Sequence, residues 1–189
     1  MTLHEIVDVI NELSVEYKIG KLQHIRKEIK DLQNLPCKTI FANASVFEKY
    51  AYHYGGRTEL QFNIGCDHFE KFRFGVAFSL ESSQSLPDVS ILYPKIERYN
   101  QYFRKHRSKF GSYSGFTEKK QVVVAEYSAG IIPEDEYTNN QNSTFFFIGK
   151  YIDKKIGDIT AKDCRTVLKT FDDLLDLYLY VESSNIHAK

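Results

Sequence analysis

The stretch Arg57-Thr-Glu-Leu-Gln-Phe-Asn-Ile64 is followed after a short break by Phe72-Arg-Phe-Gly-Val-Ala-Phe-Ser-Leu80. The first stretch alternates polar and apolar residues with period two, and the second is apolar along most of its length, a pattern typical of β-strands. Gly65-Cys-Asp-His68 between them is typical of a turn. The two stretches therefore predict an antiparallel hairpin, and Gly75 inside it indicates a bulge or the close approach of another group.

Helical patterns flank this hairpin on both sides. Apolar residues recur at helical spacing in several regions, and Ser45 is placed to cap a short helix just before the hairpin. Thr160 with Asp163 forms a capping-box-like start to the closing helix. The expected helices cover 3–13, 22–32, Ser45–Tyr50, 91–103 and 160–178.

Two further strands, Gln121–Glu126 and Phe145–Ile148, are predicted by short runs of β-branched or aromatic residues. The segment Ser108–Lys120 is rich in Gly and Ser and predicts an exposed loop, and Glu134–Ser143 predicts a polar loop. Helices at both ends with strands between them indicate one α+β domain over residues 1–189. We expect a small, mainly antiparallel sheet flanked by the N- and C-terminal helices.

Charge is balanced over the whole chain but not along it. The 25 Lys and Arg residues and 25 Asp and Glu residues give a formal net charge of zero, which argues against a nucleic-acid binder that relies on charge alone. Between Lys95 and Lys120 there are eight basic and two acidic residues, whereas from Glu126 to the end there are seven basic and eleven acidic ones. This polarity favours a basic binding face, and two solvated surfaces are the alternative.

The cysteines and the N-terminal sequence indicate the cellular compartment of the protein. The three cysteines lie far apart and do not form a disulfide framework. Cys66-Asp-His68 lacks a second pair of soft ligands at zinc-finger spacing. The first helix is charged and amphipathic, unlike a signal peptide, and no run approaches the roughly 18 apolar residues of a membrane span. We therefore expect a cytoplasmic protein without a structural metal and without a membrane partner.

The motifs of common catalytic sites are missing from the sequence. It has no Gly-x-Ser-x-Gly elbow, no Gly-x-x-x-x-Gly-Lys-Ser/Thr phosphate loop and no Gly-x-Gly-x-x-Gly fingerprint, and its six histidines share no motif. One enzymatic alternative stays open. Pro87-Asp88 followed by Glu118-Lys-Lys120 matches the pattern of nucleases whose carboxylates hold a divalent metal beside the scissile phosphate. Otherwise we expect no catalytic residue and no cofactor in this chain.

Two clusters combine basic and aromatic side chains and together predict a binding surface. Basic groups neutralise phosphates, ring faces stack on exposed bases, and tyrosines wall pockets for bases turned out of a duplex. The alternative is that the rings pack at the edge of the core. The first cluster consists of Arg104, Lys105, Arg107, Lys109, Lys119 and Lys120 with the rings of Phe110, Tyr113 and Phe116. The second consists of Tyr50, Tyr52, His53, Tyr54 and Gly55-Gly-Arg57.

Three sequence segments resemble those of a known family, and the resemblance extends over most of the chain. They are Gly55-Gly-Arg-Thr-Glu-Leu-Gln-Phe-Asn-Ile-Gly65, Phe72-Arg-Phe-Gly-Val-Ala-Phe-Ser-Leu80 and the closing helix from Ile159 to Tyr180. With the order of the elements, they resemble the N-terminal DNA-recognition domains of bacterial modification-dependent restriction systems of the McrB type. Such domains bind duplex DNA and turn a methylated cytosine out into an aromatic pocket, while a separate motor and nuclease cut the DNA.

The resemblance implies a role in anti-phage defence as the 5-methylcytosine-specific DNA-binding part of a restriction system, and it would suit a fragment of a longer restriction protein. A partner domain or subunit would then supply the motor or nuclease. The alternatives are the metal-dependent nuclease and a protein-interaction domain that uses the acidic C-terminal region. The implied base pocket consists of Tyr50, Tyr52, Tyr54, Phe74 and Tyr113. The implied phosphate contacts are Arg57, Arg104, Lys105, Arg107 and Lys109, with Lys119 and Lys120 beside them.

Overall fold

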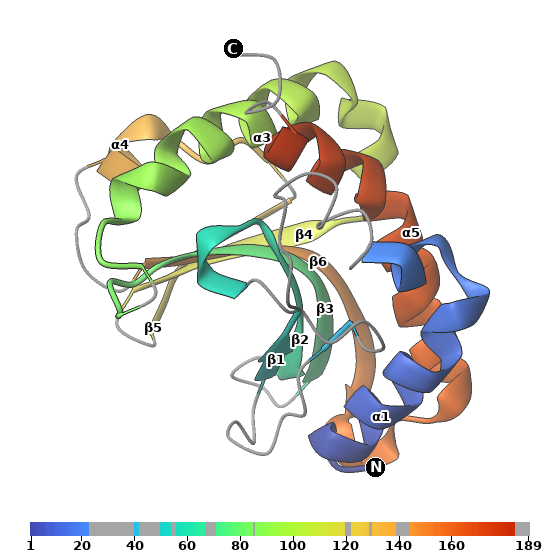
Figure 1. Ribbon diagram of the computed structural model, residues 1–189. Coiled ribbons are helices and arrows are strands. Elements are labelled where there is room, and N and C mark those ends of the chain that lie inside the picture. Colours follow the sequence, from blue (N-terminus) through green and yellow to red (C-terminus); the bar gives the residue numbers. More distant parts are fainter. Residues whose placement is uncertain are drawn as a thin grey trace.

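A single curved sheet forms the centre of the protein in the computed structural model (Figure 1). The structure describes residues 1–22, 40–41, 50–53, 56–66, 71–84, 86–119, 122–128, 130–138 and 144–183. Within these ranges, six strands pair antiparallel in the order β1-β2-β3-β6-β4-β5. The strands are β1 Tyr50–Tyr52, β2 Gln61–Cys66, β3 Lys71–Leu80, β4 Ser114–Lys119, β5 Val122–Ser128 and β6 Thr144–Lys155.

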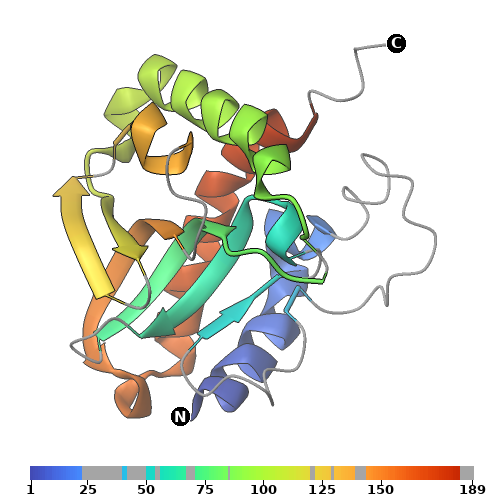
Figure 2. The ribbon, with the colours of Figure 1, turned by 90° about the vertical axis from the view of Figure 1, so that its left-hand side faces the viewer.

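The long helices gather on one side of this sheet (Figure 1). Figure 2 shows the C-terminal helix passing behind the strands. The helices are α1 Leu3–Leu13, α3 Tyr93–Lys105, α4 Glu134–Thr138 and α5 Ala161–Ser183. Short 3₁₀ turns cover Ser14–Glu16, Lys18–Lys21, Gly56–Thr58, Val89–Leu92, Arg107–Phe110 and Ile156–Asp158. The fold is therefore α+β, with an antiparallel sheet flanked by N- and C-terminal helices, as the sequence predicts. No helix in the described part of the chain has the length and apolarity needed to cross a membrane.

Capping boxes start both terminal helices. At α1, the amide of Thr2 donates to Glu5 Oε2 (2.7 Å) and the amide of Glu5 donates to Thr2 Oγ1 (3.2 Å). At α5, the amide of Thr160 donates to Asp163 Oδ2 (2.9 Å) and the amide of Asp163 donates to Thr160 Oγ1 (3.4 Å). Each box satisfies amides that the first helical turn leaves without an intrahelical acceptor. The predicted start of the closing helix is confirmed.

The two faces of the sheet carry different side chains. One face packs against α1, α3 and α5 in the main hydrophobic core. Ala77, Phe116 and Phe147 form a separate small cluster, and the pairings of Ala77 with Phe147 and of Phe147 with Phe116 place it on a single face. We call this the outer face. The same pairings assign to it Tyr50, Tyr52, Gln61, Asn63, Arg73, Gly75, Gly149 and Tyr151.

Two paired glycines stand at the centre of the outer face. Gly75 of β3 is directly opposite Gly149 of β6. A Cβ on Gly75 would collide with the backbone of Ile148, and a Cβ on Gly149 would collide with the carbonyl oxygen of Phe74. The two strands thus approach each other at a distance that only glycine permits. This confirms the close approach predicted at Gly75.

The structure corrects several predicted elements. Residues 108–120, predicted as an exposed loop, contain part of a 3₁₀ turn and the internal strand β4. Because β4 pairs with strands on both sides, the hydrogen-bonding groups of its backbone have partners. This pairing holds the segment as a strand even where its side chains are small. Tyr50 belongs to a strand rather than a helix, and the predicted polar loop after Glu134 begins with α4. The predicted helix over 22–32 and the cap at Ser45 lie outside the described residues, apart from Leu22.

Candidate functional site

The basic residues of the first predicted cluster lie at the C-terminal end of α3 and in the following 3₁₀ turn. Arg104, Lys105, Arg107 and Lys109 are all exposed. Acidic groups of α5 lie beside them: Lys109 Nζ is 3.7 Å from Asp176 Oδ2. The pKa of Tyr102, near the end of α3, is raised by burial and then by the same Asp176 carboxylate. The positive field of this cluster is therefore partly compensated by its own neighbours.

Two of the three rings of that first cluster, Phe110 and Tyr113, belong to the main core, whereas Phe116 lies on the outer face. Phe110 stacks on Phe103, with ring centroids 4.9 Å apart, and Tyr113 packs edge-on against Phe110 at 5.4 Å. Burial, followed by the charge of Asp173, raises the pKa of Tyr113. Phe74, also predicted for the base pocket, is 1% exposed in the main core. Because Phe74 and Tyr113 pack in the core, the structure does not place them on the wall of a surface pocket.

Part of the second predicted cluster does come together. Tyr50 and Tyr52 are half-buried on β1, and their rings are stacked with centroids 6.3 Å apart and an interplanar angle of 23°. Arg57 Nη1 is 3.0 Å from Glu81 Oε2 and donates a longer bond to the carbonyl oxygen of Glu81. Burial raises the pKa of Tyr50, the charges of Tyr52 and Glu81 raise it further, and those of Arg57 and Arg73 lower it. The Tyr50 ring thus lies within electrostatic reach of two guanidinium groups. Tyr54 lies outside the described residues.

Arg73 of β3 is a candidate residue that the sequence analysis did not single out. Its side chain is only 6% exposed. The guanidinium carbon lies 4.6 Å from the ring centroid of Phe147, with Phe116 and Phe145 slightly further away. A guanidinium on aromatic faces retains the planar arrangement with which it binds oxyanions and base edges. The available signal was one arginine within the apolar run of β3, flanked by Phe72 and Phe74.

Asn63 of β2 shares the outer face with Arg73. Arg73 Nη1 donates to Asn63 Oδ1 at 2.6 Å. Since arginine has donors and no acceptor, this bond fixes the orientation of the amide. Asn63 Nδ2 is buried and makes no hydrogen bond among the residues that the structure describes. A buried donor without a partner is uncommon in folded proteins and needs an explanation, of which a functional role is one.

A buried polar network holds β1 onto the helical layer. Phe62 donates its backbone N–H to His53 Nδ1 at 2.7 Å, so the His53 proton resides on Nε2, which lies 3.0 Å from Glu59 Oε2. The hydroxyl of Tyr178 on α5 donates to the same Glu59 oxygen at 2.6 Å. His53 follows Tyr52 directly, so the network fixes the strand that carries the ring pair.

A second buried pair joins α3 to α5. Lys95 Nζ donates to Glu182 Oε2 and to the carbonyl oxygen of Thr58, both at 2.6 Å. The other carboxylate oxygen of Glu182 accepts from the amide of Leu60 at 2.9 Å. This pair anchors the segment between β1 and β2, in which Arg57 lies.

Lys119, at the end of β4, is separate from both clusters. Its Nζ lies 2.7 Å from Glu136 Oε2 of α4. Lys120 lies outside the described residues. An ion pair of this kind leaves Lys119 less positive charge to offer to a phosphate.

Among the described residues, the fold does not bring those of the nuclease pattern together into a metal-binding cluster. Asp88 Oδ1 accepts from the amide of Ser90 at 2.9 Å, and hydrogen bonds from Ser90 lower the pKa of Asp88. Glu118 lies on β4 rather than in a loop, and Lys120 is not described. Among the described residues, no three or more His, Cys, Asp and Glu side chains gather in a way that could hold a metal ion.

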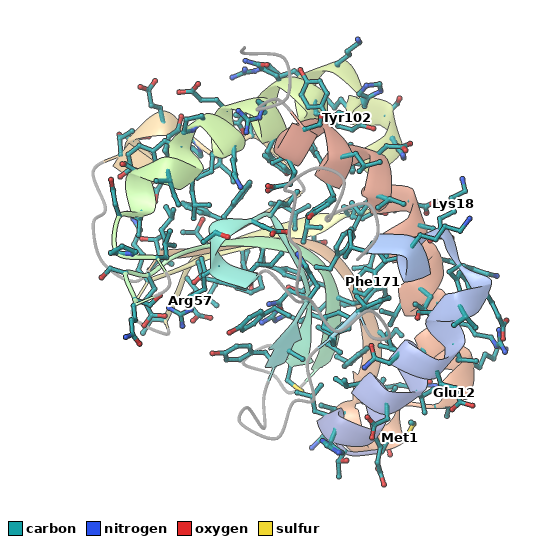
Figure 3. All side chains as sticks on the ribbon, in the orientation of Figure 1. Met1, Glu12, Lys18, Arg57, Tyr102 and Phe171 are labelled. Atoms are coloured by element: carbon teal, nitrogen blue, oxygen red, sulfur yellow. The ribbon has the colours of Figure 1, made fainter. Side chains whose placement is uncertain are left out.

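The two predicted clusters lie in different parts of the molecule. In both Figure 1 and Figure 2, the C-terminal end of α3 is at the top and β1 is in the lower half. Figure 3 shows the same separation for two labelled residues, with Tyr102 at the top and Arg57 at the left. The residues predicted to form one interface therefore form two surfaces: the α3 tip, with Arg104, Lys105, Arg107 and Lys109, and the outer face beside Tyr50 and Tyr52.

No protein-family model matches this chain, and neither a curated protein nor a solved structure matches it.

Proposed function

We propose that this chain binds DNA and recognises a base with the Tyr50–Tyr52 ring pair, with methylated cytosine in duplex DNA as the favoured target. The observation that carries the proposal is the geometry of the pair, whose centroids are 6.3 Å apart with nearly parallel planes. A planar ring held between two others needs about 7 Å, twice the contact distance of stacked carbon atoms. The 6.3 Å joins the ring centroids and is not the gap between the ring planes, so the two rings must open to about 7 Å between planes to admit a base turned out of the duplex.

The charges around the pair support an anionic ligand. Arg57 and Arg73 both lower the pKa of Tyr50, against the stronger effect of burial and the charges of Tyr52 and Glu81, which raise it. Arginine forms charge-assisted hydrogen bonds with phosphates and with the acceptor edges of bases. The ion pair with Glu81 offsets part of the Arg57 charge, so a phosphate that binds Arg57 competes with this carboxylate.

The α3 tip has a different part in the proposal. Its exposed basic residues supply phosphate contacts that do not depend on sequence, and the neighbouring carboxylates of α5 limit their strength. Specificity is assigned to the outer face alone. The resemblance to modification-dependent restriction systems supports the further assignment that a separate motor or nuclease acts on the DNA that this chain selects.

Fluorescence anisotropy tests the proposal with one labelled duplex, prepared with and without 5-methylcytosine and titrated at two salt concentrations. We expect tighter binding to the methylated duplex and persistence of this difference at the higher salt, because base stacking is less sensitive to salt than phosphate contacts are. Equal binding that disappears with salt would reduce the function to a basic patch. No binding even at low salt would refute the proposal and favour a protein-interaction domain.

The nuclease alternative is tested on the same preparation. Supercoiled plasmid is incubated with the protein and either magnesium or manganese, and nicking is followed on a gel. Because no metal cluster is present among the described residues, we expect the plasmid to stay supercoiled. Nicking that is lost in Asp88→Asn and Glu118→Gln would instead support the nuclease.

A further inference from the structure

We propose that Asn63 restricts the outer-face site to bases with an exocyclic carbonyl oxygen (cytosine, guanine and thymine) and disfavours adenine. The inference rests on the proposed function, because it specifies the chemistry that the same surface recognises. It makes base identity depend on one buried amide group beside the tyrosine pair.

Asn63 lies beside the ring pair in the sheet register, and because it is 1% exposed, a base reaches its amide only when the side chains that cover it move. In the sheet register it is directly opposite Tyr52 on β1 and directly opposite Gly75 on β3. Directly opposite residues of neighbouring strands have Cβ atoms about 5 Å apart, so the Asn63 amide and the Tyr52 ring are neighbours on the outer face. On the other side of Asn63, the row continues with Gly75 and Gly149, which carry no side chains.

The hydrogen-bonding capacity of this amide is divided. Its acceptor, Oδ1, is engaged by Arg73 Nη1 at 2.6 Å. Its donor, Nδ2, is buried without a hydrogen-bond partner in the described part of the chain, and the whole residue is 1% exposed. A buried donor left without an acceptor is destabilising, so a ligand that supplies an acceptor recovers this lost free energy.

The same division explains why adenine is disfavoured. An asparagine with both amide atoms available is the usual partner of adenine, because it accepts from the exocyclic amine and donates to a ring nitrogen. In Asn63 the acceptor Oδ1 is already engaged by Arg73, so the Asn63–Arg73 pair offers donors only. A ring nitrogen of adenine can accept from Nδ2, but the adjacent exocyclic amine then faces a donor, whereas a carbonyl oxygen at that place does not. A carbonyl oxygen of a base accepts from Nδ2, and the positive charge of the nearby Arg73 guanidinium strengthens this hydrogen bond.

Four duplexes that differ only in one unpaired, bulged base test the inference. The bulge is C, G, T or A, and binding of each duplex is measured by anisotropy at one salt concentration. We expect the wild-type protein to bind the C, G and T bulges about tenfold more tightly than the A bulge, the discrimination expected of a well-placed base contact. Equal affinity for all four in the wild type would overturn the inference without any need for a variant.

Asn63→Asp removes only the donor. A carboxylate at this position still accepts from Arg73, so the bond that orders the arginine is retained, but no N–H remains for a carbonyl. We expect the tenfold preference to disappear in this variant. Gln61→Glu is the matched control, because it makes the same change on the same strand and face and introduces the same charge. It should keep the preference, and retention of the preference in Asn63→Asp would overturn the inference.

These outcomes separate the two proposals. Discrimination of methylated from unmethylated duplex, together with equal binding of the four bulges, would leave the DNA-binding function standing and remove the role of Asn63. Failure of the wild type to bind any duplex at low salt would remove both.

Discussion

The α3 tip and the outer face contain the same kinds of residue but arrange them in opposite ways. At the α3 tip, basic side chains point outward beside the acids of α5, while Phe110 and Tyr113 pack into the core. On the outer face, the rings of Tyr50 and Tyr52 stay half-buried near Arg57 and Arg73, and polar groups are buried among them. Proximity of basic and aromatic residues in the sequence is therefore a weak guide to a site, since the two kinds of side chain can leave the backbone on different sides.

The comparison also shows how each region is supported. The segment next to the tyrosine pair is held by two buried networks, one around Glu59 and one around Glu182. Such networks position side chains closely because each polar group requires its partners. The α3 tip has a surface ion pair between Lys109 and Asp176, and such pairs contribute little to stability. We therefore expect mutations near the outer face to change stability and recognition, and mutations at the tip to change mainly salt-dependent affinity.

The largest expected effect separates the two ends of α3. Lys95→Met leaves the Glu182 carboxylate buried without its cation and should lower the free energy of unfolding by about 3 kcal/mol. Lys105→Met, on the exposed end of the same helix, should change it by less than about 0.5 kcal/mol. Urea unfolding followed by circular dichroism measures both. Equal losses would show that the buried pair is not what holds this segment.

Removal of one ring tests which surface recognises the base. Tyr52→Ala should weaken binding of the methylated duplex about tenfold and remove its advantage over the unmethylated one, since a base–aromatic stack contributes about 1–3 kcal/mol. Tyr180→Ala is the matched control, because Tyr180 is a 42% exposed ring that packs against Tyr102 near the α3 tip. Anisotropy titrations compare the two variants. If Tyr180→Ala abolishes the discrimination and Tyr52→Ala does not, the roles of the two surfaces are reversed.

The α3 tip should affect mainly the salt dependence of DNA affinity. The double variant Arg104→Ala with Lys105→Ala should weaken binding of methylated and unmethylated duplexes equally, by a few-fold at low salt. It should also reduce the slope of log K against log salt by about one unit for each phosphate that the variant no longer neutralises. Lys162→Ala with Lys169→Ala removes two exposed lysines of α5 and is the control. An unchanged slope in the Arg104 and Lys105 variant would exclude the tip from the DNA interface.

Much of the fold could be predicted from periodicity. The hairpin, the helix after Pro87 and the capped closing helix are predicted because each has a local signal: alternation, a break in the chain or a capping pair. The bounds of the first strand are wrong, because Arg57 lies in a 3₁₀ turn and Gly65 and Cys66 belong to β2 rather than to the turn. Strand β4 was missed because its Ser114 and Gly115 are typical of loops, and only its position between β6 and β5 makes it a strand. Pairing of this kind depends on residues far away in the chain, which a local pattern does not contain.

The candidate site was only partly predictable. Tyr50, Tyr52 and Arg57 lie close in sequence, so the sequence predicts them as one cluster, whereas Asn63 and Arg73 become neighbours only through the register of β2 and β3. Arg73 is not predicted as a site residue, since the sequence shows only one charged residue in an apolar run. A charged residue in an apolar strand, on the face opposite the core, is a candidate site residue. The register of the neighbouring strands then identifies the side chain that it contacts.

The smallest expected effect concerns α5, which supports both regions. Burial tends to raise the pKa of Asp163, but hydrogen bonds from Lys154 and from Thr160 outweigh it, so the folded-state pKa lies below the ordinary value of 3.8. A depressed carboxyl pKa stabilises the fold above its unfolded value, and this contribution is lost as the pH falls through the folded value. Asp163→Asn should therefore lower stability by about 0.5 kcal/mol near neutral pH, the lower end of what loss of a helix cap costs. At a pH below the folded-state pKa, the difference from wild type should disappear. Urea midpoints of both proteins across this acid range measure the effect, and a difference that stays constant with pH would show that the cap acts through its shape rather than its charge.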